Sequence, residues 1–243
     1  MSRITRFDPS EFTSQVGGDV KDFSPKDYMD GKESRRMDLF ALFAVVSALQ
    51  AVEDAGLKNG GYDPERLGVI IGNGIGGIET LETNFKKLFA RGPKSIHPLT
   101  TPMMIANIAG ANIAIKLNAQ GPCHTVITAC ASATDAIGDG YRWIKQDGAD
   151  IIVAGGTEGA LTPMGLASFC VLQAVSTRRN NEPDKASRPF DKERDGFILA
   201  EGAGVLVLEE LEHAKKRGAQ IYAEVAGYGV SCDANHLTAP HPE

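Results

Sequence analysis

Cys130 is the residue of this sequence best suited to covalent chemistry. It lies in the stretch V-I-T-A-C-A-S-A, residues 126–133, between an apolar run and several very small side chains. A helix that starts at Ala131 would place Cys130 at a helix N-terminus, whose partial positive charge favours thiolate over thiol. The unpaired N–H groups of that helix end could also stabilise an oxyanion formed by attack on an acyl carbon. These features are typical of a nucleophile on a sharp strand-to-helix turn.

A structural cysteine is the competing interpretation of Cys130. Free cysteine is among the most buried residue types, and position alone favours a small core residue over a nucleophile. The small neighbours fit tight packing, and they equally leave room for a group to approach the sulfur. The remaining cysteines keep the structural interpretation: Cys123, Cys170 and Cys232.

The elements around Cys130 alternate between strands and helices. Such alternation predicts an α/β fold with a largely parallel sheet, whose ligands collect at the carboxyl ends of the strands, where Cys130 stands. The expected strands cover residues 67–71, 123–129, 150–156, 204–208 and 221–226. The expected helices cover residues 34–57, 78–90, 103–117 and 131–146, with a short helix between the last two strands. Residues 176–190 are expected to form a polar surface loop.

Two glycines, Gly138 and Gly140, lie inside the helix that follows Cys130. Each costs about 1 kcal/mol relative to alanine, a cost usually offset by the close approach of another backbone. We therefore expect this helix to be buried between two layers of the fold.

Composition excludes several classes of function. The 243 residues carry a net charge of −6 with a pI near 5.4, which gives no electrostatic footprint for nucleic acid. No apolar run approaches the roughly 20 residues of a membrane-spanning helix, and the N-terminus lacks a signal-peptide pattern. Four cysteines without C-x-x-C spacing predict reduced thiols and a cytoplasmic protein.

Four stretches together resemble the β-ketoacyl-acyl-carrier-protein synthases, most closely the type II condensing enzymes of bacterial fatty-acid synthesis. They are T-A-C-A-S-A, A-G-G-T-E (154–158), S-R-P-F-D-K-E-R-D-G-F (187–197) and E-G-A-G-V-L-V-L-E (201–209). The resemblance implies that Cys130 accepts an acyl chain, with its backbone N–H in the oxyanion hole. A decarboxylative Claisen condensation with malonyl-carrier protein would follow. No cofactor is implied beyond the phosphopantetheine of the acyl-carrier protein, which is the expected partner.

The resemblance also implies a thiolase-like fold, in which two α/β halves form αβαβα layers. Residues 1–243 are expected to be one N-terminal thiolase-like domain, truncated at both ends and lacking the first strand and helix. The helix after Cys130 would belong to the buried central layer. The strand at 123–129 matches the family's dimer-interface strand, which implies a homodimer. The family's two active-site histidines and lysine belong to the other half, and none of the five histidines here matches them, so this chain alone is not expected to complete the condensation.

Three further positions carry over from the family one at a time. Ile75 matches a residue that lines the acyl-chain pocket, Phe197 an aromatic beside the active-site entrance, and Thr238 a threonine that contacts the pantetheine arm. Without the family, a core role explains Ile75 as well as a pocket role does, a core role is favoured for Phe197, and Thr238 is a loop hydroxyl.

A basic cluster is the last candidate site. Lys32, Arg35 and Arg36 lie within five residues, with Lys94 further along the chain, and such a cluster could steer an acidic partner. A solvated helix end is the simpler interpretation from sequence, but the family's carrier-protein docking patch falls at these positions. Gln173 stands where the family often has another basic docking residue.

Three alternatives to the fatty-acid enzyme remain at this stage. The chain could be a non-catalytic structural or dimerisation half, although the intact cysteine argues against that. A polyketide-type ketosynthase would share the chemistry and differ in substrate. A thiolase acting on coenzyme A thioesters fits the S-R-P-F-D-K-E-R-D-G-F stretch poorly.

Overall fold

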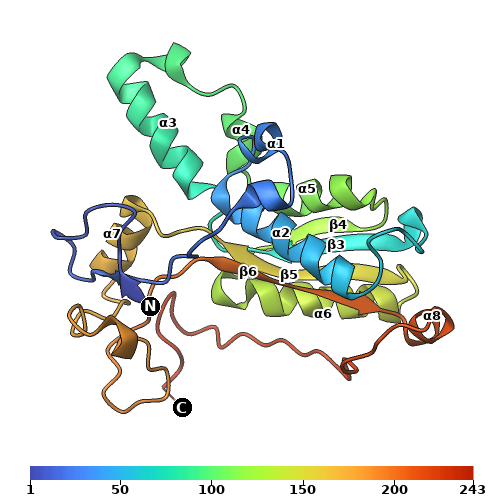
Figure 1. Cartoon of the computed structure of the whole chain (residues 1–243). Helices are drawn as coiled ribbons and strands as arrows, with labels where there is room; N and C mark the ends of the chain where they lie inside the picture. The colour runs from blue at the N-terminus through green and yellow to red at the C-terminus, as the bar shows by residue number, and fades with distance from the viewer. Residues whose placement is uncertain (243) are drawn as a thin grey trace.

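A four-stranded sheet lies between layers of helices in the computed structural model, which describes residues 1–242 (Figure 1). Glu243, the last residue of the expected domain, lies outside the described residues. The strands of this sheet are β3 (Leu67–Gly72), β4 (Cys123–Val126), β5 (Ile151–Glu158) and β6 (Gly202–Glu209). The helices are α1 (Gly31–Ser34), α2 (Leu39–Asp54), α3 (Ile78–Arg91), α4 (Thr100–Met104), α5 (Ile108–Leu117), α6 (Ser132–Lys145), α7 (Pro163–Val171) and α8 (Leu211–Lys216).

The strand order is β4-β3-β5-β6. Strand β3 runs parallel to β4 and β5, whereas β6 pairs antiparallel with β5. The carboxyl ends of three strands therefore meet at one end of the sheet, as the alternation of strands and helices predicts.

The central strands β3 and β5 are buried on both faces because they are apolar except at Thr157 and Glu158, the last two residues of β5. Side chains alternate between faces along a strand, so Val69 and Val153 pack with α2 and α5, while Ile70 and Ile152 pack with α6. Such two-sided burial explains why L-G-V-I-I shows no alternation of polar residues.

Two smaller parts stand beside this layered body. Helix α3 projects from it as an arm (Figure 1). Around α7, a separate apolar cluster contains Leu161, Leu166 and Leu199, and it also takes Ile4 from the N-terminal segment. That segment holds a two-stranded sheet of β1 (Ser2–Arg3) and β2 (Val16–Gly17).

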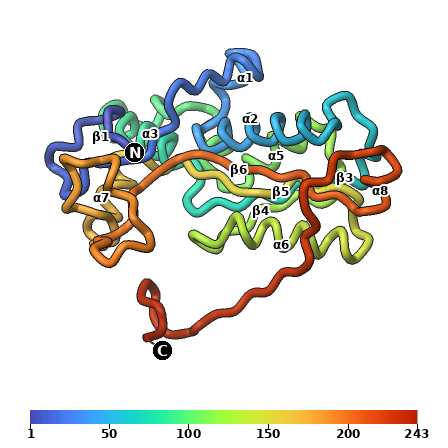
Figure 2. The backbone as a smooth tube through the Cα atoms, turned by 60° about the horizontal axis from the view of Figure 1, so that its bottom comes forward, coloured from blue at the N-terminus to red at the C-terminus, as the bar shows by residue number. Residues whose placement is uncertain are grey.

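Four sequence expectations need correction. The helix expected at 34–57 is divided into α1 and α2, and the one at 103–117 into α4 and α5. The strand expected at 123–129 ends at Val126, where the chain turns into α6. Residues 221–226, which the structure describes, form no strand. An apolar pattern gives a strand only where a neighbouring strand pairs with it, and this segment instead runs beside α6, unpaired (Figure 2).

Helix α6 meets the expectation of burial on one face only. One face packs on the sheet, but the other is largely open in the described structure, where Arg142, Trp143 and Lys145 are exposed. Burial between two layers is therefore not observed. The close approach at the glycines is confirmed, but by side chains: a Cβ on Gly140 would lie 3.0 Å from Ile152 Cγ2, and one on Gly138 would overlap the Tyr228 ring.

Candidate active site around Cys130

Cys130 lies on a strained turn and is exposed to solvent. The turn is a short 3₁₀ helix, Ala129–Ala131, between β4 and α6. Ala129 has a φ of 50°, in the left-handed region that alanine rarely adopts. Such a conformation persists only where the surroundings enforce it, and it is common at functional sites. Exposure of Cys130 excludes the interpretation of a buried core cysteine.

Ser132 holds the turn from inside. Its buried hydroxyl accepts the Thr128 N–H at 2.9 Å and donates to the Ala129 carbonyl at 2.7 Å. A Cβ on Gly72, at the end of β3, would overlap the carbonyl of Ser132. The small residues after Cys130 therefore do pack tightly against the strand ends, while the sulfur itself remains accessible.

Asp135 joins the turn to a distant part of the chain. Its carboxylate accepts the Thr128 hydroxyl at 2.5 Å and the Tyr228 hydroxyl at 2.6 Å. These two hydrogen bonds lower the pKa of the Asp135 carboxyl, the Thr128 bond contributing most. Sequence reasoning missed both Asp135 and Tyr228, and the only local signal was the glycine at 138, on which the Tyr228 ring lies.

Ile75 lies beside the turn, on the loop that follows β3, and its side chain is 40% exposed. The Ser132 hydroxyl lies 3.3 Å from the Asn73 carbonyl of this loop, which places the loop next to the Cys130 turn. Glu158, at the end of β5, accepts the Gly74 N–H at 2.9 Å. Burial raises the pKa of the Glu158 carboxyl, although its bonds to the loop backbone oppose the shift. Sequence analysis identified the A-G-G-T-E motif but not this contact.

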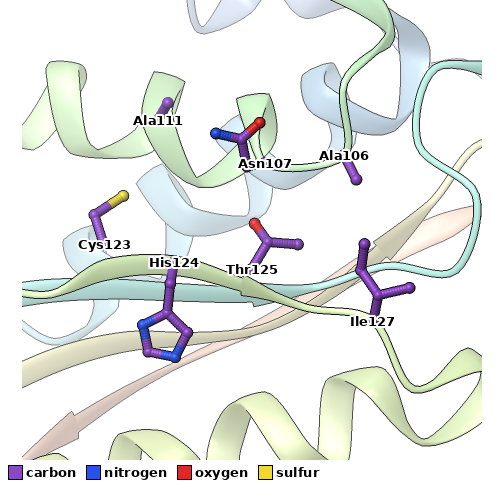
Figure 3. A pocket seen from close by; sticks show the side chains of 7 residues that line it. All are labelled: Ala106, Asn107, Ala111, Cys123, His124, Thr125 and Ile127. Carbon is purple, nitrogen blue, oxygen red and sulfur yellow. The ribbon is translucent and has the colours of Figure 1, made fainter.

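An open hollow of about 410 Å³ lies between α5 and β4. Its lining comprises Ala106, Asn107, Ala111, Cys123, His124, Thr125 and Ile127. The Thr125 and Ile127 side chains extend toward the α5 side, and the His124 ring extends toward the opposite side (Figure 3). Asn73 donates to the Ala106 carbonyl at 2.9 Å, so the hollow adjoins the Ile75 loop. A partly apolar hollow near an exposed thiol could hold a chain attached to that sulfur.

Phe197 lies beside α7 and is 44% exposed, so it is not a core residue. Its ring contacts Phe169 edge-to-face at 5.2 Å between centroids. Phe169 packs on the α7 cluster, which Ile78 from the start of α3 also contacts. Phe197 is thus linked through this cluster to the segment that carries Ile75.

Thr238 lies in the exposed segment after α8. Its N–H donates to His236 Nδ1 at 3.2 Å within the same segment. Figure 2 shows the end of this segment standing off the layered body. The described structure therefore does not bring Thr238 to Cys130.

The basic residues divide into two places. Lys32, Arg35 and Arg36 are exposed in and just after α1, whereas Lys94 is exposed beyond the outer end of the α3 arm (Figure 1). Within residues 1–242, none of the four forms a salt bridge. Gln173 lies two residues after the end of α7, with a left-handed φ of 58°. One chain alone thus presents the cluster at α1 and holds Lys94 apart from it.

The described residues contain no group of three or more His, Cys, Asp or Glu side chains that could hold a metal ion. No helix within residues 1–242 is long and apolar enough to cross a membrane.

Comparisons with known proteins identify relatives over almost the whole chain. Residues 1–214 match the family described as β-ketoacyl synthase, N-terminal domain. A 3-oxoacyl-[acyl-carrier-protein] synthase 2 of Synechocystis sp. is 48% identical over 240 residues, covering 99% of this chain and 58% of the relative. Its namesake from Coxiella burnetii is 49% identical with the same coverage. A β-ketoacyl synthase crystal structure from Burkholderia phymatum STM815 matches with a TM-score of 0.87 at 32% identity, covering 98% of this chain and 59% of that chain. The chain thus spans about 58% of the length of these curated relatives.

Proposed function

Because the chain belongs to the β-ketoacyl synthase family, we propose that it carries the acyl-accepting nucleophile of a 3-oxoacyl-[acyl-carrier-protein] synthase of fatty-acid elongation. The observation that carries this proposal is the exposed Cys130 on a strained turn, at the carboxyl end of β4 and directly before α6. The name shared by the two relatives supports acyl-carrier protein as the source of the acyl chain.

In the proposed first step, the Cys130 thiolate attacks the carbonyl carbon of the carrier-bound thioester. A new carbon–sulfur bond forms to Cys130, the bond to the pantetheine sulfur breaks, and that sulfur leaves as a thiolate and takes up a proton. The Ala131 N–H already donates to the Thr128 carbonyl at 3.1 Å, so we assign the oxyanion of the intermediate to the Cys130 N–H.

The second step, condensation with malonyl-carrier protein, is proposed for the whole enzyme. None of the five histidines of this sequence lies in a motif that matches the family's catalytic histidines. We therefore propose that residues 1–243 form the N-terminal thiolase-like domain, which accepts the acyl chain and leaves decarboxylation to residues outside it.

The remaining candidate residues take positions around this chemistry. The acyl chain would occupy the hollow between α5 and β4, with Ile75 at its border. Phe197 would flank the entrance, and Thr238 would contact the pantetheine arm once its segment is docked. Lys32, Arg35, Arg36 and Lys94 would bind the acidic carrier protein; because Lys94 lies apart from the α1 cluster, we place it at a second contact.

A dimerisation role is the second candidate, favoured by one observation. Strand β4 is an edge strand of the sheet, and edge strands readily pair with another chain. We propose that β4 mediates homodimerisation in addition to acyl transfer. The exposed Cys130 argues against a purely structural half.

Intact mass measurement tests the acyl-transfer proposal. The purified chain is incubated with an acyl-carrier protein loaded with a saturated acyl thioester, and the modified residue is located by peptide mass mapping. We expect one acyl adduct, at Cys130, that is absent in Cys130→Ser. Cys232→Ser is the matched control, since Cys232 is also exposed and lies outside the proposed acyl hollow, and this variant should acylate normally. A folded chain with no adduct at Cys130 contradicts the proposed function.

A further inference from the structure

Two side chains of the segment after α8 donate hydrogen bonds to the layered body, Tyr222 to Asp54 of α2 and Tyr228 to Asp135 of α6. Of residues 220–242, Tyr228 is the only one that is partly buried, and the others are exposed. Its ring lies on Gly138 of α6, and the Arg142 guanidinium stands 4.7 Å from the ring centroid. Any side chain at position 138 would overlap this ring. Gly138 therefore leaves the space on α6 in which the Tyr228 ring packs.

The Tyr228 hydroxyl donates a hydrogen bond to Asp135, which lies one helical turn closer to Cys130 than Gly138 does. One carboxylate oxygen of Asp135 accepts the tyrosine hydroxyl at 2.6 Å. The other accepts the hydroxyl of Thr128, two residues before Cys130, at 2.5 Å. Short bonds to a carboxylate are the stronger class of hydrogen bond. The carboxylate is thus shared between the C-terminal segment and the Cys130 turn.

We propose that Asp135 is a positioning residue whose carboxylate couples docking of the C-terminal segment, through Tyr228, to the geometry of the Cys130 turn, through Thr128. The inference rests on the proposed function in taking Cys130 as the nucleophile. When the Tyr228 ring packs on Gly138, the Asp135 carboxylate is fixed and orients Thr128, the residue directly before the left-handed Ala129. Raised pKa of the Tyr228 phenol, caused mainly by its bond to Asp135, agrees with this geometry.

Coupling of this kind is reciprocal, since a free energy shared between two contacts acts in both directions. Cutting the bond at Tyr228 should loosen the turn, and cutting the bond at Thr128 should loosen the segment. If Tyr228 only anchored its own segment, its loss would leave the Cys130 turn unchanged, and loss of the Thr128 bond would leave the segment unchanged.

Hydrogen exchange followed by mass spectrometry tests the coupling in the 243-residue chain. Tyr228→Phe deletes the hydroxyl and keeps the ring, and Thr128→Val deletes the other donor at nearly constant shape. We expect each variant to raise amide exchange about fivefold in both 126–133 and 222–232, the change expected from losing one hydrogen bond. Tyr222→Phe is the matched control, because the Tyr222 hydroxyl donates to Asp54 at 3.2 Å away from the turn. It should alter exchange only near residue 222.

The rate at which the carrier-bound thioester acylates Cys130 is the functional measurement. We expect Tyr228→Phe to slow acylation about fivefold or less, while Tyr222→Phe leaves the rate unchanged. The inference is overturned if Tyr228→Phe frees 222–232 and leaves exchange in 126–133 unchanged, or if Thr128→Val affects the turn alone. Absence of acylation in the unaltered chain contradicts the proposed function instead, and the exchange result still decides the coupling.

Discussion

At the scale of single residues, the position of Cys130 depends on two glycines, which have no side chain to keep the turn away from the sheet. The turn packs its backbone onto the ends of β3 and β5, where Gly72 faces Ser132 and Gly156 faces Ala133. A Cβ on Gly156 would lie 2.5 Å from that of Ala133, well inside contact distance. The glycines of these strands thus fix how closely the nucleophile approaches the sheet.

Gly72→Ala should displace the Cys130 turn. The added methyl would overlap the Ser132 backbone, and overpacking of this kind costs about 3 kcal/mol in the free energy of unfolding. Urea unfolding measures the loss, and peptide-resolved alkylation of Cys130 by iodoacetamide should show a changed rate. Gly204→Ala is the control, since a Cβ there meets nothing within 4 Å. A Gly72→Ala chain as stable as Gly204→Ala would show that the turn does not rest on β3.

At the scale of elements, two carboxyls hold the segment between β3 and α3. Glu158 accepts the Gly74 N–H at its start, and Asp38 accepts the Thr80 N–H at 2.8 Å at its end. Asp38 is 4% exposed, and its Oδ1 has no hydrogen-bond partner among the described residues. This arrangement keeps Ile75 outward on a fixed loop, but it desolvates the Asp38 carboxylate.

Stability should respond to pH with opposite sign at Asp38 and Asp195. Burial raises the pKa of Asp38. The contribution of Asp38 to the free energy of unfolding is therefore fully present below its unfolded pKa of about 3.9, and it is lost as pH rises through the folded pKa. For Asp195, burial alone would raise the pKa, but hydrogen bonds from Ser176 and from the N–H groups of Arg178 and Thr177 outweigh it and lower the pKa. Its contribution is present above the unfolded pKa and is lost as pH falls through the folded value.

Urea unfolding between pH 3 and 8 checks this pair. Relative to the unaltered chain, Asp38→Asn should become more stable as pH rises, because asparagine keeps an acceptor for Thr80 and carries no buried charge. Asp195→Asn should instead lose about 1–2 kcal/mol near neutral pH, where the charged acceptor matters, and little at pH 3. Parallel pH profiles for the two variants would contradict the assignment.

Elements with a continuous local pattern could be predicted from the sequence. The strand expected at 67–71 is Leu67–Gly72 and the helix expected at 78–90 is Ile78–Arg91, and the thiolase-like fold is confirmed by the match to solved ketosynthases. The strand at 221–226 is wrong because strand formation depends on a pairing partner that the local pattern does not reveal. The site divides in the same way. Cys130 has a local turn signature, whereas Asp135 and Tyr228 are 93 residues apart in sequence and no spacing rule connects them.

At the scale of the whole molecule, β4 leaves one side of the sheet open. The Pro122 carbonyl accepts the N–H of Val69 in β3, and the Val126 carbonyl accepts that of Asn73, directly after β3. Backbone groups alternate in direction along a strand, so the N–H and C=O of Cys123 and Thr125 face away from β3. Exposed apolar side chains accompany this edge, with Ile127 at 58% and Ile115 of α5 at 79% exposure. An unpaired edge flanked by apolar surface is the geometry that pairs with a second strand.

Thr125→Pro should therefore convert a dimer into a monomer. Proline removes the outward N–H at the centre of the open edge, whereas the bonds to β3 come from the even-numbered residues of β4. Sedimentation equilibrium measures the association, with circular dichroism as the check that the variant remains folded. Thr125→Val is the matched control: it keeps the N–H and loses only a hydroxyl that has no partner among the described residues, so it should remain dimeric. Because the proposed acyl hollow is lined by the same strand, the monomeric variant should also acylate Cys130 less with long chains than with acetyl. An unaltered chain that sediments as a monomer, or a Thr125→Pro chain that stays dimeric while folded, contradicts pairing through β4.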